Sequence, residues 1–130
     1  MAKQFTLGKN ERLKSRKMIE QLFSAGKKFV IAPFRVFYIV DKNENSSLQF
    51  GAAVSSKNFR KAVDRNRVKR VMRETYRLHK KGLQEKIKQQ SCQLNIFIIY
   101  TAKELPVYKE VYSKMEKILD KLCNLLSEIK

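Results

Sequence analysis

The segment that most constrains this chain is a strongly basic stretch able to form one amphipathic helix. Residues 57–77, KNFRKAVDRNRVKRVMRETYR, hold nine Lys or Arg residues, opposed only by Asp64 and Glu74. At about 3.6 residues per turn, one side of such a helix is mostly apolar and carries Val68, Val71, Met72, Thr75 and His79. The other side carries Asn66, Lys69, Arg70, Arg73 and Arg77. We therefore expect a helix that buries one face and exposes a row of cations.

The charge of this helix points to an anionic partner. Like charges four residues apart, such as Lys69 and Arg73, each cost a few tenths of a kcal/mol, roughly 0.2–0.5, in an isolated helix. The whole chain has a formal charge of +17, and residues 1–102 carry 23 basic and 7 acidic side chains. Such a balance favours a polyanion, because Lys and Arg contacts to phosphates release condensed counterions. Nucleic acid is the leading candidate, with an anionic membrane surface or a merely solvated face as alternatives.

Length and composition limit the other possibilities. One hundred and thirty residues predict a single domain, in which residues 1–9 form a flexible basic arm. No stretch approaches the roughly twenty apolar residues of a membrane span, and the N-terminus lacks the apolar core of a secretory signal. Cys92 and Cys123 lie far apart without a CxxC pair, which argues against a metal site or disulfide framework. We expect a cytoplasmic protein.

Hydrophobic periodicity predicts six elements in the order α-β-β-α-β-α, an α+β fold built as a single-domain sandwich. Gly26 and Gly82 are expected to follow the ends of the first two helices. The unbroken apolar run LNIFIIY predicts a buried central strand, parallel to the strand before it because a helix joins the two. The expected elements are a helix at 11–25, a strand at 34–40 after a short extended segment at 29–32, an antiparallel return strand at 48–55, a helix at 61–80, a strand at 94–100 and a helix at 108–128. For the polar segment 83–93 the sequence leaves open whether it is loop or further helix.

The strand at 34–40 is apolar on both faces, which indicates that both are covered for at least part of the time. A leading helix against the second face would leave a cleft walled by aromatic and basic groups. Two interpretations stay open for the apolar residues of the helix and strand. They are core residues, or some of them line a groove in which unstacked bases rest. The residues concerned are Ile19, Leu22, Phe23, Val36 and Tyr38.

Catalysis by the protein itself has little support in the sequence. The twelve carboxylates are scattered, with no acid/base pair and no cluster of Mg²⁺ ligands. The four glycines are too far apart for a phosphate-binding loop. His79, on or beside the apolar stripe, is interpreted as a packing residue or surface donor. A stand-alone nuclease is therefore the least favoured of the functions considered.

The run Arg65-Asn66-Arg67-Val68-Lys69-Arg70, with Arg73 after it and Lys57 upstream, resembles the RNR signature of the protein subunit of bacterial ribonuclease P. This resemblance implies an α/β sandwich of the ribosomal-protein-S5-like type with a left-handed crossover. It also implies a catalytic RNA subunit that holds Mg²⁺ and removes the 5' leader from precursor tRNA. The protein would bind the leader and stabilise substrate and Mg²⁺ binding, with no protein partner and no membrane.

Site residues follow from the same resemblance. The RNA-binding motif would comprise Arg65, Asn66, Arg67, Lys69, Arg70 and Arg73. Further basic contacts would come from Lys57, Arg60, Lys61 and Arg77, and the leader cleft from Ile19, Phe23, Val36 and Tyr38. Since the family often has an aromatic residue where Ile19 stands, stacking by the first helix would depend on Phe23. The alternative function is a ribosomal or ribosome-assembly protein that binds rRNA.

Overall fold

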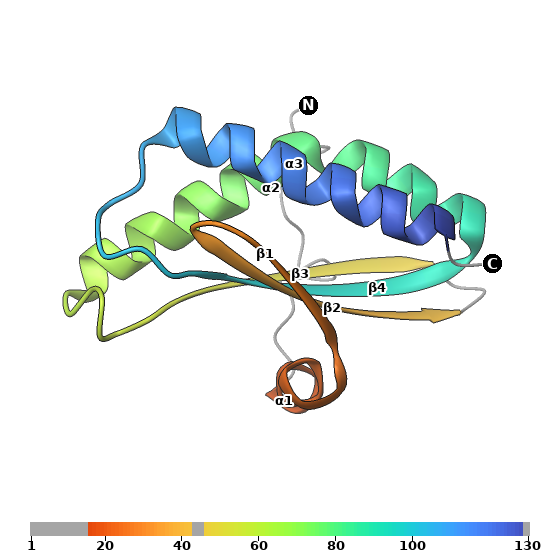
Figure 1. The fold of residues 1–130 in the computed structure, drawn as a ribbon, viewed down its shortest axis with the longest axis horizontal. Coiled ribbons are helices and arrows are strands. Elements are labelled where there is room, and N and C mark those ends of the chain that lie inside the picture. The colour runs from red at the N-terminus through yellow and green to blue at the C-terminus, as the bar shows by residue number, and fades with distance from the viewer. Residues whose placement is uncertain (1–15, 43–45, 129–130) are drawn as a thin grey trace.

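Three helices and four strands make up the part of the chain that the computed structural model describes, residues 16–42 and 46–128. The strands form one mixed sheet in the order β1-β2-β4-β3 (Figure 1). The expected basic arm, 1–9, and the start of the first helix, 11–15, lie outside the described residues. The elements are α1 (Arg16–Ala25), β1 (Lys27–Ile31), β2 (Phe34–Lys42), β3 (Ser47–Val54), α2 (Ala62–Gln90), β4 (Cys92–Tyr100) and α3 (Tyr108–Glu128).

The apolar strand β4 occupies the centre of the sheet, as its sequence predicts. It pairs in parallel with β3, which confirms that the two strands joined by α2 run in the same direction. It also pairs antiparallel with β2 along nine residues, from Phe34 opposite Tyr100 to Lys42 opposite Cys92. The expectation that 48–55 returns alongside β2 is therefore wrong. The apolar strand β4 lies between β2 and β3, where both of its edges are paired.

One strand was not predicted as such. Residues 27–31, of which the sequence predicted only 29–31 to be extended, form β1 and pair antiparallel with β2 from Lys27 opposite Tyr38 to Ile31 opposite Phe34. The turn contains a cis peptide bond between Ala32 and Pro33. The observed order is thus α-β-β-β-α-β-α, and β1 and β3 are the two edge strands of the described sheet.

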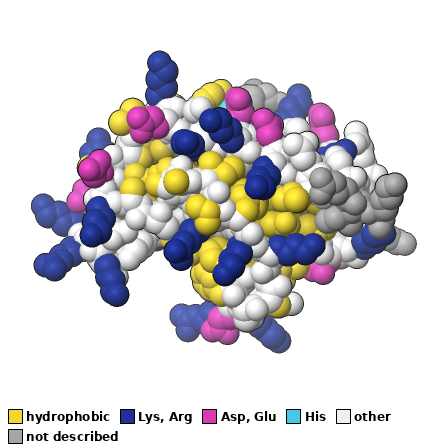
Figure 2. Space-filling model, in the orientation of Figure 1, with side chains coloured by type: hydrophobic (Ala, Val, Ile, Leu, Met, Phe, Trp, Pro, Cys, Tyr) yellow, Lys and Arg dark blue, Asp and Glu magenta, His cyan; other side chains and the backbone are white. Residues whose placement is uncertain are grey.

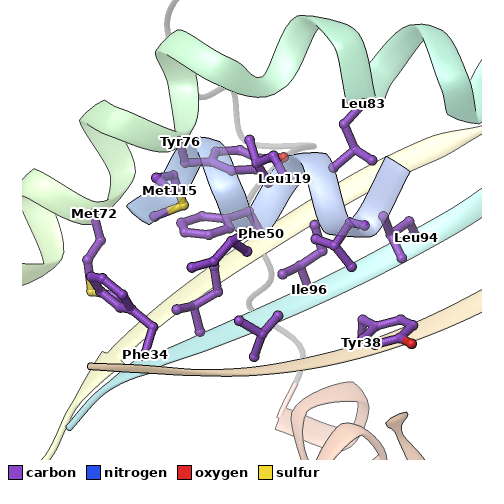
Figure 3. Packing of buried hydrophobic residues seen from close by; sticks show 14 of the residues in the cluster. Phe34, Tyr38, Phe50, Met72, Tyr76, Leu83, Leu94, Ile96, Met115 and Leu119 are labelled. Carbon is purple, nitrogen blue, oxygen red and sulfur yellow. The ribbon is translucent and has the colours of Figure 1, made fainter. Parts of the chain in front are cut away.

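The main core lies between the sheet and the layer formed by α2 and α3 (Figure 3). Alternate residues of β2 and β4 point into it, and α3 contributes the stripe that its heptad-like spacing predicts. The rings of Phe50 on β3 and Tyr76 on α2 stack with centroids 4.0 Å apart. The α3 residues are Val111, Met115, Ile118, Leu119, Leu122 and Leu126.

The second helix is longer than expected, because it does not end before Gly82. It continues through this glycine to Gln90 and ends at Ser91, whose φ of 50° and ψ of 57° are left-handed. Leu83 and Ile87 extend the buried stripe beyond the glycine, and their burial outweighs its low helix propensity. A Cβ at Gly82 would have no heavy atom within 4 Å, so no packing requirement demands a glycine there.

The opposite face of the sheet is covered by α1, which lies across it in Figure 1. Leu22 and Phe97 are the buried centre of this smaller cluster, and Ile39 and Ile99 pack against it. The helix ends at Ala25 as predicted, and the Gly26 amide donates to the Leu22 carbonyl oxygen at 3.1 Å. A Cβ at Gly26 would collide with that oxygen, which explains the glycine without a positive φ.

Candidate nucleic-acid interface

The cationic side chains of α2 are presented as the amphipathic pattern predicts. Val68, Met72 and Tyr76 are fully buried against the sheet and hold the helix in place. On the outward side Asn66, Arg67, Arg70 and Arg73 are exposed and Lys69 is half-buried; we call these five residues the basic ridge. A helix fixed by its buried face presents these groups in a constant spacing. That arrangement suits a structured polyanion, for which most contacts are to phosphates.

The loop before α2 adds cations to the start of the ridge. Lys57, Arg60 and Lys61 are all exposed there. Lys61 is the N-cap of α2 and makes no side-chain capping hydrogen bond, so the amide groups of the first turn remain open to an anion. Figure 2 shows several Lys and Arg side chains projecting from the left end of the molecule, where α2 begins in Figure 1.

Arg65, predicted as part of the RNA-binding motif, is engaged within the protein. Its Nη1 donates to the carbonyl oxygens of Phe59 and Arg60, both at 2.8 Å. The loop is fixed further by the Asn58 side-chain amide, which donates to the Thr101 carbonyl oxygen at 3.1 Å, and by the buried Phe59 ring. Arg65 therefore shapes the loop that carries the neighbouring cations.

Arg77, predicted as a further basic contact beyond the motif, is half-buried and less exposed than most residues of the basic ridge. Its guanidinium lies 3.9 Å from the Glu74 carboxylate, one turn back on the helix. An ion pair at this distance and exposure adds little stability, but it offsets part of the local positive charge. We place Arg77 beside the ridge and not within it.

The α1 face of the sheet carries an exposed aromatic group. Phe23 is 48% exposed and meets Phe37 and Phe97 edge to face, with centroids 5.0 and 5.4 Å apart. We call these three residues the aromatic trio. Ile19 is half-buried next to it in the same cluster. About half of the Phe23 side chain is thus open to solvent while two further rings pack against it, and an exposed aromatic side chain is a group on which an unpaired base can stack.

Two of the predicted cleft residues lie elsewhere. Val36 and Tyr38 are 0% and 7% exposed and belong to the main core beneath α2 and α3, so their grouping with Ile19 and Phe23 is wrong. Side chains alternate along a strand, and α1 covers the face of β2 that bears Phe37 and Ile39. The alternation was visible in the sequence. Which of the two apolar faces α1 covers was not.

The same face holds a polar residue that the sequence analysis missed. Asn95 is fully buried in β4, between Ile39 on β2 and Gln49 on β3, and neither its side-chain nitrogen nor its oxygen has a hydrogen-bond partner among the residues that the structure describes. Its signal in the sequence is a single amide inside the run LNIFIIY. Leaving such a group without partners costs about 1–3 kcal/mol.

The other candidate groups, His79, Cys92 and Cys123, pack against neighbouring residues of the protein. The His79 ring packs against Tyr112 with centroids 4.2 Å apart. Burial raises the pKa of the Cys92 thiol, and burial together with Asp120 raises the pKa of Cys123 despite the opposing effect of Lys86.

Within residues 16–42 and 46–128, no three His, Cys, Asp or Glu side chains come together as a metal-binding group. No helix in the same residues is long and apolar enough to cross a membrane.

Comparison with known proteins agrees with this geometry. The family model described as Ribonuclease P matches residues 7–123. This chain belongs to the ribonuclease P protein family. It is 38% identical to the ribonuclease P protein component of Porphyromonas gingivalis, over 88% of this chain and 85% of that protein. A second relative, from Chlorobium phaeobacteroides, is 40% identical over 60% of this chain and 56% of its own length.

Solved structures of ribonuclease P proteins share the fold. The Staphylococcus aureus protein superposes with a TM-score of 0.64 at 22% identity, over 88% of this chain and 96% of its own. The Thermotoga maritima protein gives a TM-score of 0.56 at 28% identity, over 92% and 98%. As a ribonuclease P protein, the chain is the RNA-binding protein part of a ribonucleoprotein that processes tRNA, and its partner is the RNA subunit.

Proposed function

We propose that this chain assists the catalytic RNA of ribonuclease P in endonucleolytic removal of the 5' leader from precursor tRNA. The supporting observation is the basic ridge, in which exposed cations stand along one helix whose opposite side is anchored in the core. Lys57, Arg60 and Lys61 of the preceding loop extend the ridge. Together, the cations of the ridge and the loop would neutralise the crowded phosphates where the RNA subunit and the substrate meet. This removal of the leader would take place in the cytoplasm.

The leader would rest on the α1 face of the sheet. Phe23 would stack with one unpaired base, supported by Phe37 and Phe97, and Ile19 would border that base on the helix. A precursor has a leader to occupy this surface and the mature tRNA does not. Contact here therefore favours binding of precursor over product. This assignment replaces Val36 and Tyr38 by residues of the opposite face.

The chemistry of Mg²⁺ would belong to the RNA partner. Such ions, when bound near the scissile phosphodiester, stabilise charge on the attacking and leaving oxygens. The described carboxylates of this chain do not gather into a site for them. The contribution of the protein would be indirect: cations of the basic ridge lower repulsion between phosphates, so that substrate and metal bind the RNA subunit at lower concentrations.

Reconstitution tests the proposal. RNA that co-purifies with the chain should cleave precursor tRNA in the presence of Mg²⁺. Adding the protein should lower the substrate concentration that this RNA needs for half-maximal cleavage. RNA-free protein should leave the same precursor intact. Specific cleavage by the RNA-free protein would overturn the proposal. So would co-migration with ribosomal subunits without any precursor-cleaving RNA, since that is the behaviour of an rRNA-binding or ribosome-assembly protein.

A further inference from the structure

A neutral side chain ties the basic loop before α2, residues 55–61, to the end of the sheet. The side-chain nitrogen Nδ2 of Asn58 donates to the carbonyl oxygen of Thr101 at 3.1 Å, across a separation of 43 residues in the chain. Val54, the last residue of β3, is paired with Tyr100, the last residue of β4. The loop therefore starts beside the residue that accepts this hydrogen bond, and the bond closes the loop back over the end of β4.

The acceptor of this hydrogen bond is itself fixed. Thr101 donates to the Pro33 carbonyl oxygen from both its backbone nitrogen and its hydroxyl Oγ1, each at 2.8 Å. Pro33 lies in the turn between β1 and β2, and Tyr100, just before Thr101, is paired with Phe34 on β2. The backbone that Asn58 contacts is thus held by the sheet and by this turn, which makes it a rigid support for the loop.

Local hydrogen bonds fix the shape of the loop around Lys57. The backbone nitrogen of Lys57 donates to the Ser55 hydroxyl oxygen at 3.2 Å. The backbone nitrogens of Asn58 and Phe59 both donate to the Ser55 carbonyl oxygen, also at 3.2 Å. These bonds make a tight turn with the Lys57 side chain exposed on it. They set the shape of the turn, whereas the Asn58 side chain sets its position relative to the sheet.

The two cations later in the loop depend on other contacts. Arg65 Nη1 donates to the carbonyl oxygens of Phe59 and Arg60 at 2.8 Å, and the Phe59 ring is buried. Lys61 is the N-cap of α2 and is joined directly to its first turn. Loss of the Asn58 amide should therefore release the turn that carries the first loop cation and leave the other two in place.

We propose that Asn58 is a positioning residue for binding of the RNA subunit: its hydrogen bond to Thr101 holds Lys57 where the ammonium group meets a phosphate of that RNA. This inference rests on the proposed function, in which the loop cations contact RNA. The bond acts by preorganisation, because a cation on an anchored turn loses less conformational freedom when it binds. A hydrogen bond between neutral groups changes an equilibrium constant by about two- to twelvefold, which bounds its effect on the population of the anchored turn.

Binding of the full chain to its RNA subunit over a salt series tests the inference. Lys57→Ala should weaken binding and lower the slope of log affinity against log salt by about 0.9, because one phosphate contact is lost. Asn58→Ala removes no charge. It should nevertheless weaken binding by about two- to tenfold and lower the same slope toward that of Lys57→Ala. Asn124→Ala, the same substitution at an exposed position of α3, is the matched control and should change neither quantity.

A double-mutant cycle shows whether the amide acts through the lysine. The losses of affinity in Asn58→Ala and Lys57→Ala should combine to less than their product, because a misplaced lysine contributes little. The losses in Asn58→Ala and Arg70→Ala should multiply, since Arg70 stands on the basic ridge away from the loop. An amide that contacts RNA itself, or that only stabilises the fold, would leave the salt slope unchanged and multiply with Lys57→Ala. Either result overturns the inference.

Failure of the proposed function has a different signature in the same experiment. If Lys57→Ala and Arg70→Ala both bind the RNA subunit as tightly as the wild type does, the cations of the loop and the ridge do not contact RNA. The proposed function and the positioning role are then both refuted. If these two variants bind more weakly while Asn58→Ala binds like the wild type, only the positioning role is refuted.

Discussion

Arg65 and Arg67 stand two residues apart on α2 and have different surroundings. Arg65 Nη1 donates to the Phe59 and Arg60 carbonyl oxygens at 2.8 Å, whereas Arg67 is exposed on the opposite side of the helix turn. One arginine of the motif thus shapes a loop, and the other is exposed and open to a partner. Their variants should separate stability from binding.

Arg65→Ala should destabilise the fold by about 1–3 kcal/mol, because two carbonyl oxygens lose a charged donor. Arg67→Ala should change stability by no more than about 0.5 kcal/mol, as for most exposed positions. Its affinity for the RNA subunit should nevertheless fall, with a salt slope lower by about 0.9. Urea unfolding and RNA binding over a salt series measure the two effects, with Lys117→Ala as control. Equal losses of stability in both arginine variants would contradict this division.

Gly82→Ala should stabilise the protein by about 1 kcal/mol, because Gly82 lies inside a helix and a Cβ there meets open space. Gly26→Ala is the matched comparison. It should destabilise, since its Cβ collides with the Leu22 carbonyl oxygen. Thermal unfolding of both variants checks the pair, and a lowered Tm for Gly82→Ala would show that α2 does not continue through this position in solution.

Asn95→Val should raise the free energy of unfolding by about 1–3 kcal/mol, because it removes a buried amide without partners and suits a strand. The Asn95→Thr side chain has nearly the same shape as the valine but retains a polar group. The free energy of unfolding should therefore rise less in Asn95→Thr than in Asn95→Val. Urea denaturation of all three proteins gives the comparison. Loss of stability in Asn95→Val would mean that the amide has a stabilising partner in solution.

Phe23→Ala should abolish most of the preference for leader-bearing tRNA over mature tRNA, because it removes the exposed ring of the aromatic trio. Base stacking on an aromatic side chain contributes about 1–3 kcal/mol, so discrimination should fall between several-fold and a hundredfold. Competition binding with the two RNAs measures it. Val30→Ala, which shortens an exposed residue of β1, is the control, and unchanged discrimination in Phe23→Ala would exclude Phe23 from the leader site.

The two thiols should make the fold less stable at alkaline pH. Burial raises the pKa of Cys92 and of Cys123 above the ordinary value of 9.0, so the folded state holds these protons more tightly than the unfolded state. The contribution is fully present below pH 9.0 and is lost as the pH rises through the raised values. The double variant Cys92→Ala/Cys123→Ala should show a flatter decline in unfolding free energy above pH 9.0. An unchanged decline would assign it to other groups.

The sequence by itself determined the elements whose patterns are long and one-sided. The spacing of Val68, Met72 and Thr75 predicted the buried face of α2, and the opposite row of cations predicted an exposed ridge. The apolar run in β4 predicted its central position, and the stripe of α3 predicted that helix to its observed bounds. These predictions succeed because burial of apolar area is set by periodicity along a single element.

Only the tertiary structure decided how separate elements meet. The strand order placed β4 between β2 and β3, and the docking of α1 selected Phe37 and Phe97 instead of Val36 and Tyr38 as neighbours of Phe23. It also turned Arg65 toward the backbone of its own loop. When both faces of a strand are apolar, periodicity cannot distinguish them, because the choice depends on contacts between residues far apart in the chain.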